Sequence, residues 1–246
     1  MLKPVGNNFV KSYRISYNLE ALERVREKIG LKAYLRLRNL LEYRLRGGDF
    51  DRSPLNVKVA VAFSGGSDST ATVNILKWAG FQVVPVTVKL PQMDEDVLQK
   101  AVDLGAVLVD IPEYMDVMMT QMKKGSPICG RCHLMVMEAV EKKTRELGIG
   151  ILATGDLLSS GLVSIYEKKN LVILNLPAFL ALDKGEIIDM IGGSYDLSFG
   201  CPLLWELFRK APSTKRFSIQ RVLREVRAKA LTPEIAEKLI MDILSR

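Results

Sequence analysis

Apolar residues follow two alternating patterns along this chain of 246 residues. One pattern is a short, almost wholly apolar and β-branched run, such as residues 57–63, which is typical of a strand buried on both faces. The other is a longer stretch with apolar residues at helical spacing. In chain order, the strands and helices predicted for the central region cover 57–63, 69–79, 81–88, 94–104, 106–111, 130–147, 149–154 and 171–174. Strands that alternate with helices predict an α/β fold with a parallel, doubly wound sheet.

Helical patterns also precede and follow this central region. We predict a first helix that Asn18 caps and Gly30 ends, and a second helix over residues 31–46. The tail, residues 218–244, predicts two basic amphipathic helices. The resulting division is an N-terminal helical extension over 1–54, a core domain over 55–205 and a basic C-terminal helical segment over 206–246.

Positive charge is concentrated at both ends of the chain. The formal net charge is +7, and residues 1–54 hold 12 basic and 6 acidic side chains, while residues 206–246 hold 10 and 5. This distribution permits a polyanionic partner such as RNA, although two solvated helical faces explain it equally well. The candidate RNA contacts are Arg209, Lys210, Lys215, Arg216, Arg221 and Arg224. If they bind phosphates, affinity falls steeply as salt rises.

The chain lacks the patterns of secretion and of membrane insertion. No apolar run approaches the roughly 20 residues that a membrane helix needs, and the N-terminus lacks the apolar core of a signal peptide. Three cysteines are present, and an odd count argues against a disulfide framework. We therefore expect a cytoplasmic protein.

A phosphate-binding loop is predicted directly after the first strand. Residues 64–69 read Ser-Gly-Gly-Ser-Asp-Ser, and a helix begins at once. Two glycines let successive backbone N–H groups turn into one concavity, and the helix dipole and the serine hydroxyls add to it, so the loop suits a pyrophosphate. Asp68 would repel phosphates unless a cation lay between them, so we assign it to Mg²⁺. The string is neither a Walker A loop nor a dinucleotide-binding fingerprint.

The stretch Ala62-Phe63-Ser64-Gly65-Gly66-Ser67-Asp68-Ser69 resembles the signature of the PP-loop ATP pyrophosphatases, a HUP-like superfamily of adenine-nucleotide α-hydrolases. The resemblance implies an enzyme that adenylates an acceptor oxygen, releases pyrophosphate and lets a nucleophile displace AMP. It also implies that the end of the second strand, near Thr87, contacts adenine through its backbone. The nucleotide-binding residues expected on these grounds are Ser64, Gly65, Gly66, Ser67, Asp68, Ser69, Thr87 and Gly155.

The cysteines form a second candidate centre. Cys129-x-x-Cys132 stands at the start of a predicted helix, where the helix dipole and Arg131 are expected to lower thiol pKa values. Cys201 follows about 70 residues later. Three thiolates are one short of a closed zinc site, whose fourth ligand would have to be His133, a carboxylate or an exogenous group. Three can also hold a [4Fe–4S] cluster with one open iron, and a redox dithiol or inert core cysteines remain alternatives.

The order of these features resembles one branch of the superfamily, the iron–sulfur-dependent tRNA 2-thiocytidine and 2-thiouridine synthetases. Those proteins have the loop, then C-x-x-C heading a helix, then a strand ending in Ala-Thr-Gly, here Ala153-Thr154-Gly155, and then one late cysteine. The resemblance implies that Cys129, Cys132 and Cys201 ligate the cluster. It covers roughly residues 57–245. Where the family usually has His-Asn after Thr-Gly, this chain has Asp156, which can bind Mg²⁺ or orient the nucleophile.

These observations predict an ATP-dependent sulfurtransferase of the tRNA-thiolation type, forming AMP and pyrophosphate. Its cofactors are ATP, Mg²⁺ and a [4Fe–4S] cluster. Its partners are a tRNA or another sulfur acceptor and a sulfur donor of unknown identity. A homodimer is one of the oligomeric states considered. The predicted catalytic residues are Asp68, Asp156, Cys129 and Cys201. One alternative is a PP-loop ligase or amidotransferase acting on a small carboxylate, with zinc or no metal at the cysteines. Another is a protein that binds ATP without turnover.

Overall fold

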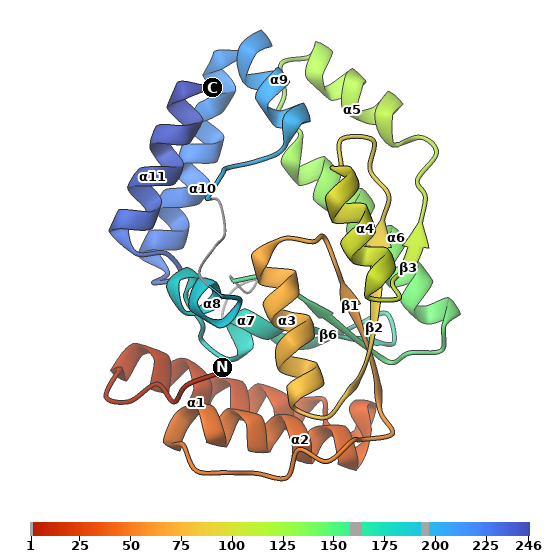
Figure 1. Ribbon diagram of the computed structural model, residues 1–246, viewed down its shortest axis with the longest axis vertical. Coiled ribbons are helices and arrows are strands. Elements are labelled where there is room, and N and C mark those ends of the chain that lie inside the picture. The colour runs from red at the N-terminus through yellow and green to blue at the C-terminus, as the bar shows by residue number, and fades with distance from the viewer. Residues whose placement is uncertain (1, 158–163, 193–196) are drawn as a thin grey trace.

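A six-stranded, mostly parallel sheet forms the centre of the protein (Figure 1). The computed structural model describes residues 2–157, 164–192 and 197–246. The strands are β1 (Lys58–Ala62), β2 (Gln82–Val88), β3 (Val107–Val109), β4 (Ile151–Thr154), β5 (Ile165–Lys168) and β6 (Leu171–Asn175), in the spatial order β3-β2-β1-β4-β6-β5. The predicted α/β class and doubly wound sheet are confirmed. One correction applies at the edge, because β5, which the sequence did not predict, pairs antiparallel with β6.

The strand order reverses between β1 and β4. From β1 the chain runs outward to β2 and β3, and β4 then returns to the other side of β1. In open parallel sheets, ligands bind at such a reversal, beyond the carboxyl ends of the two strands. The loop of residues 64–69 follows β1, and residues 155–156 follow β4, so both segments lie at this point.

Helices cover both faces of the sheet. On one face lie α3 (Ser67–Trp78), α7 (Leu176–Phe179) and α8 (Lys184–Met190), which share one apolar core with the N-terminal helices. On the other face α6 (Cys129–Glu146) packs on β1, β2, β3 and β4. The helix α4 (Glu95–Asp103) connects β2 with β3. The helices predicted over 69–79, 94–104 and 130–147 are confirmed.

The N-terminal helices begin earlier than the sequence predicted. Asn8 caps α1 (Phe9–Arg24) by accepting a hydrogen bond from the Lys11 N–H, and α2 covers Arg26–Arg46. The predicted cap Asn18 is therefore wrong: it lies within α1, is buried, and donates from Nδ2 to the carbonyl oxygens of Ala178 and Phe179. The distant carbonyls satisfy this amide better than a local cap could. The backbone does leave helical geometry at Gly30, where φ is +77°.

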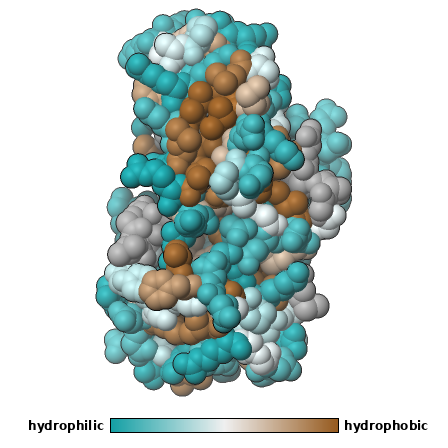
Figure 2. All heavy atoms as spheres, turned by 90° about the vertical axis from the view of Figure 1, so that its left-hand side faces the viewer, coloured by the Kyte–Doolittle hydropathy of each residue, from teal (hydrophilic) through white to brown (hydrophobic). Residues whose placement is uncertain are grey.

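The C-terminal helices form a second apolar core with α5 (Tyr114–Lys123), in the upper part of Figure 1. They are α9 (Pro202–Lys210), α10 (Lys215–Arg227) and α11 (Pro233–Ser245). The predicted pair in the tail is confirmed, and Thr232 caps α11 by accepting from the Ile235 N–H. Figure 2, which faces the left-hand side of Figure 1, shows apolar side chains gathered over its upper part. Met241 and Leu244 of α11 are among the exposed apolar side chains.

Among the helices of the three described ranges, none combines the length and the apolar character needed to cross a membrane.

Candidate active site

The loop after β1 requires glycine at position 65. Gly65 has φ +73°, in the left-handed region where a side chain is strained, and a Cβ there would lie 2.5 Å from Cγ1 of Val97 on α4. Gly66 is the N-cap of α3, with extended backbone angles. The chain can therefore turn sharply from strand to helix, and α4 can pack against the turn.

Serine hydroxyls hold the loop in shape. Ser69 Oγ donates to the Gly66 carbonyl oxygen at 3.0 Å and accepts from the Ser64 N–H at 3.3 Å. Ser69 is buried and Ser64 is exposed. Ser69, which we expected to donate to phosphate, is thus already used to brace the loop, whereas Ser64 faces solvent.

Lys184, which the sequence reasoning did not assign to the site, reaches this loop from α8. Its Nζ lies 2.7 Å from Asp68 Oδ1 and 2.6 Å from Ser67 Oγ. The ammonium is largely shielded, since the side chain is 15% exposed against 31% for Asp68. A sequence signal did exist: Asp183 and Glu186 form a capping box, which places Lys184 at the first position of α8.

The end of β4 touches the first turn of α3. A Cβ on Gly155 would lie 2.8 Å from the Ser69 nitrogen and 2.9 Å from the Asp68 carbonyl carbon, so only glycine fits. The next residue, Asp156, accepts through Oδ2 from the Thr154 hydroxyl at 2.9 Å. The structure thus brings Gly155 against the first turn of α3, with Asp156 next to it in the chain.

Thr87 lies at the end of β2 and is fully buried. Its Oγ1 donates to the Phe63 carbonyl oxygen at 2.9 Å, which joins the ends of β1 and β2. The side chain is therefore committed to the sheet. A contact of this residue with adenine can come only from its backbone, and it stays a prediction.

The three cysteines come from two helix starts. Cys129 is the first residue of α6, Cys132 follows one turn later, and Cys201 is the N-cap of α9; all three are free thiols. The Tyr114 hydroxyl contacts Cys132 Sγ at 3.1 Å. Cys201 is close enough to Cys129 and to Cys132 to disfavour the charged form of each.

The thiol pKa values move in the direction opposite to our prediction. Burial, and next the nearby Cys201, raise the pKa of Cys129 to about 11, and the opposing effect of a cation comes from Arg221 on α10. Burial also raises the pKa of Cys132, against the Tyr114 hydrogen bond. Desolvation of a thiolate and repulsion between neighbouring thiolates outweigh the helix dipole here.

The donor chemistry of this centre fits a thiophilic metal group. Cys201 contributes to raising the pKa of both Cys129 and Cys132, and this repulsion between thiolates would be lost if they shared a cationic group. His133, one of the fourth ligands considered, is exposed. Within the described ranges, no three His, Cys, Asp or Glu side chains are grouped closely enough to hold a metal ion. The protein alone therefore supplies the thiols without closing a site around them.

Arg221 of α10 is exposed and donates from Nε to Glu225 at 3.0 Å. Partial burial works to lower its pKa, but the charge and hydrogen bond of Glu225, followed by the nearby Cys129 and Asp156, outweigh it and raise the pKa. Arg221 is therefore near both Cys129 and the acid at the end of β4. The sequence reasoning grouped it with RNA contacts and did not foresee this position.

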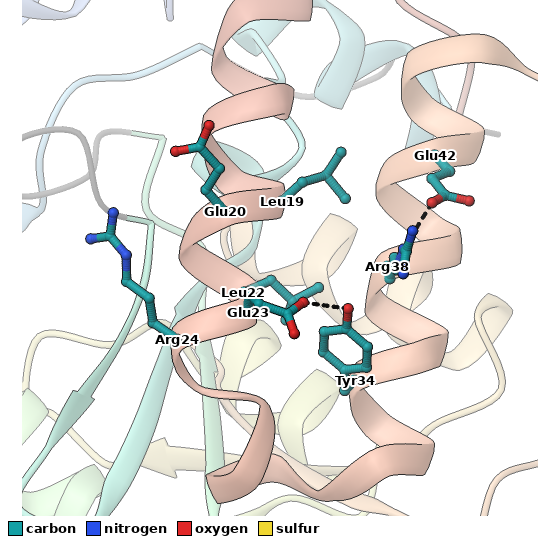
Figure 3. Close-up of a pocket in the computed structure, with 8 residues that line it drawn as sticks. All are labelled: Leu19, Glu20, Leu22, Glu23, Arg24, Tyr34, Arg38 and Glu42. Carbon is teal, nitrogen blue, oxygen red and sulfur yellow. Dashed lines mark hydrogen bonds and ion pairs between the residues drawn. The ribbon is translucent and has the colours of Figure 1, made fainter.

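One hollow, of about 580 Å³, lies between α1 and α2, away from these residues (Figure 3). The side chains around it bind each other: the Tyr34 hydroxyl donates to Glu23, and Arg38 donates to Glu42. This hollow shares none of its lining with the loop or the cysteines.

Sequence similarity to a known protein extends over the whole chain. The chain is 32% identical over 260 aligned positions to the uncharacterized protein MJ1638 of Methanocaldococcus jannaschii, covering 98% of this chain and 95% of that protein. No family model matches.

Partial and looser similarities point to tRNA-thiolating enzymes. The tRNA-specific 2-thiouridylase MnmA of Rhodospirillum centenum is 30% identical over 131 residues, which covers 43% of this chain and a third (33%) of that enzyme. The U34-tRNA thiolase NcsA of Methanococcus maripaludis, solved with its [4Fe-4S] cluster, overlaps 99% of this chain and 82% of its own, at 14% identity and a TM-score of 0.43. At that TM-score the backbones superpose too loosely to support an inference about the site.

Proposed function

The chain belongs to the family of MJ1638 and has the PP-loop ATP pyrophosphatase fold, distantly similar to tRNA thiolases, and we propose that it cleaves Mg·ATP between the α and β phosphates to activate an acceptor. The observation that carries this proposal is the loop of residues 64–69 at the strand-order reversal, braced by Ser69 and contacted by Lys184. A cation beside a loop that starts a helix provides the charge that a pyrophosphate leaving group needs.

Asp68 and Lys184 have complementary tasks in this proposal. Without nucleotide they neutralise each other at 2.7 Å. With Mg·ATP bound, Asp68 would hold the magnesium ion and Lys184 would turn to the phosphate oxygens. Each group has a partner of opposite charge both before and after the nucleotide binds, so neither is left desolvated and unpaired.

The cysteines are the second part of the proposal. Cys129, Cys132 and Cys201 would hold a [4Fe–4S] cluster, and the cluster, when bound, would supply an open iron position that can carry sulfur. Arg221 would orient an anionic group of the acceptor between the thiols and Asp156. A tRNA is the acceptor we favour, with exposed basic residues of α9 and α10, among them Arg209, Arg216 and Arg224, binding its phosphates.

A ligase acting on a small carboxylate, with no metal at the cysteines, is the second candidate. The arrangement of the described side chains favours it, because no three His, Cys, Asp or Glu among them are grouped closely enough to hold a metal ion. In that case the cysteines would be inert, and their removal would leave turnover unchanged.

Anaerobic purification followed by incubation with Mg·ATP and either bulk tRNA with inorganic sulfide or a small carboxylate with ammonia tests both candidates. We expect a brown protein with about four irons per chain, AMP and pyrophosphate formed in equal amounts, and thiolated nucleosides in the digested tRNA. A colourless, fully active protein would favour the ligase. Absence of AMP and pyrophosphate with every acceptor would contradict both candidates.

A further inference from the structure

The N-terminal helices meet the core at the short segment that carries Lys184. Asn18 of α1 binds the carbonyl oxygens of Ala178 and Phe179, and Arg44 of α2 donates from Nε to the Leu180 carbonyl oxygen at 3.0 Å. The Lys184 N–H donates to the Ala230 carbonyl oxygen at 2.9 Å, so the C-terminal helices hold the same residue from another side. The segment 176–190 is thus held by elements distant in sequence.

Two carboxylates flank Lys184, and cations of the N-terminal helices bind both. Lys11 Nζ lies 2.6 Å from Asp183 Oδ2 and 2.8 Å from Glu186 Oε2. Arg44 NH2 lies 2.7 and 2.9 Å from the two oxygens of Glu186. Arg44 has no exposed side-chain surface, and the Lys11 side chain is 13% exposed. These are shielded ion pairs, in which a missing partner leaves a charge uncompensated.

The same carboxylates also shape α8 at the point where it carries Lys184. Asp183 Oδ1 accepts from the Glu186 N–H at 2.9 Å, and the Asp183 N–H donates to Glu186 Oε2 at 3.1 Å. If Lys11 were absent, Asp183 and Glu186 would carry excess negative charge within reach of the flexible ammonium of Lys184. They would compete with Asp68 and phosphate for that ammonium.

We propose that α1 and α2 act as a charge clamp, in which Lys11 and Arg44 neutralise Asp183 and Glu186 and so keep Lys184 directed at the phosphates of a nucleotide. This inference rests on the proposed function, because it needs a polyphosphate at residues 64–69. It assigns a task to the part of the chain for which the sequence showed no resemblance. Lys11 and Arg44 are positioning residues, since they act through Asp183, Glu186 and Lys184.

Lys11→Met is the variant that tests the clamp, because the Lys11 side chain is partly exposed, whereas loss of the fully buried Arg44 can unfold the protein. Calorimetry in the presence of Mg²⁺ would measure the affinity of the full-length protein for α,β-methylene-ATP and for AMP. We expect Lys11→Met to lower the affinity for the triphosphate analogue by about tenfold, a typical size of coupling between sites. The affinity for AMP should stay within about twofold of the wild-type value. Lys11→Arg keeps the ion pairs and should restore the affinity.

Two further variants separate the clamp from a general structural effect. Lys28→Met removes another ion pair of α2, with Glu167 at 3.3 Å, which does not reach α8, and it should leave both affinities unchanged. In a Lys184→Met background, Lys11→Met should cause no further loss of affinity for the analogue. An equal loss of affinity for AMP and for the analogue, or no loss of affinity for either, would overturn the clamp while the proposed function stands. Failure of the wild-type protein to bind the analogue would instead refute the proposed function, and the clamp with it.

Discussion

The nucleotide loop and the three cysteines differ in how far the protein alone organises them. The loop is braced by its own hydroxyls, closed by α4 and paired with a lysine. The thiols share one neighbourhood, yet the pKa values of Cys129 and Cys132 are raised and the described side chains do not close around a metal. Backbone geometry and hydrogen bonds can prepare a phosphate site in advance, whereas a thiolate site cannot form before the cation that offsets its repulsion.

Asp68→Ala should have the largest effect on turnover. It removes the proposed Mg²⁺ ligand and leaves Lys184 without its carboxylate, so we expect AMP and pyrophosphate formation to fall by about 10²- to 10³-fold. Iron content should not change, because the cysteines are organised independently. Asp94→Ala is the matched control, since Asp94 is exposed and its side chain caps nothing. Wild-type rates in Asp68→Ala would disprove the assignment.

Cys201→Ser should separate the two regions most clearly. Serine is a good N-cap for α9, so the fold should be kept. We expect anaerobically purified protein to lose most of the roughly four irons per chain that a cubane would supply. Affinity for the triphosphate analogue should stay near that of the wild-type protein. Iron content and thiolation both unchanged in this variant would show that Cys201 is not a ligand.

Gly65→Ala should measure how rigidly the loop is preformed. The new methyl group meets Val97 at 2.5 Å, and φ is +73°. We expect the free energy of unfolding, measured with urea, to fall by about 1–3 kcal/mol. Gly65→Ala combined with Val97→Ala should recover part of this loss, because the steric component is relieved. A Gly65→Ala protein as stable as the wild type would mean that the loop adapts freely.

Low pH should lower the free energy of unfolding through Asp183, at the start of α8. This is the smallest of the four expected effects. Burial alone would raise the pKa of Asp183, but the hydrogen bonds and charge of Lys11, with two backbone N–H groups, outweigh it and lower the pKa. The folded state therefore binds its proton less readily than the unfolded chain. Its stabilising contribution is present above the ordinary carboxyl pKa of 3.8 and is lost as pH falls through the lower folded value.

Urea unfolding of Asp183→Asn at pH 6 and pH 3 would check this direction. The variant should be less stable than the wild type at pH 6, and the difference should shrink at pH 3. Asp116→Asn, at an exposed position of α5, serves as the control with the same chemical change. A difference that grows toward pH 3 would contradict the sign.

Local sequence determined the strand runs, the helices between them and the loop string at residues 64–69. These features depend on neighbours within a few positions: β-branched apolar runs form buried strands, and glycine pairs permit the turn into a helix. Sequence order also indicated which cysteines would share a region, although it predicted the wrong direction for their pKa values, because burial by distant elements exceeded the effect of their own helix.

Only the tertiary structure decided the partners that come from far along the chain. Lys184 lies 116 residues from Asp68, and Lys11 lies 172 residues from Asp183. Asn18 has the residue type of a cap and a position that suits one, yet distant carbonyls bind its amide. A polar side chain is satisfied by whatever the fold brings near it, and that choice is global because the packing of the apolar core fixes which surfaces meet.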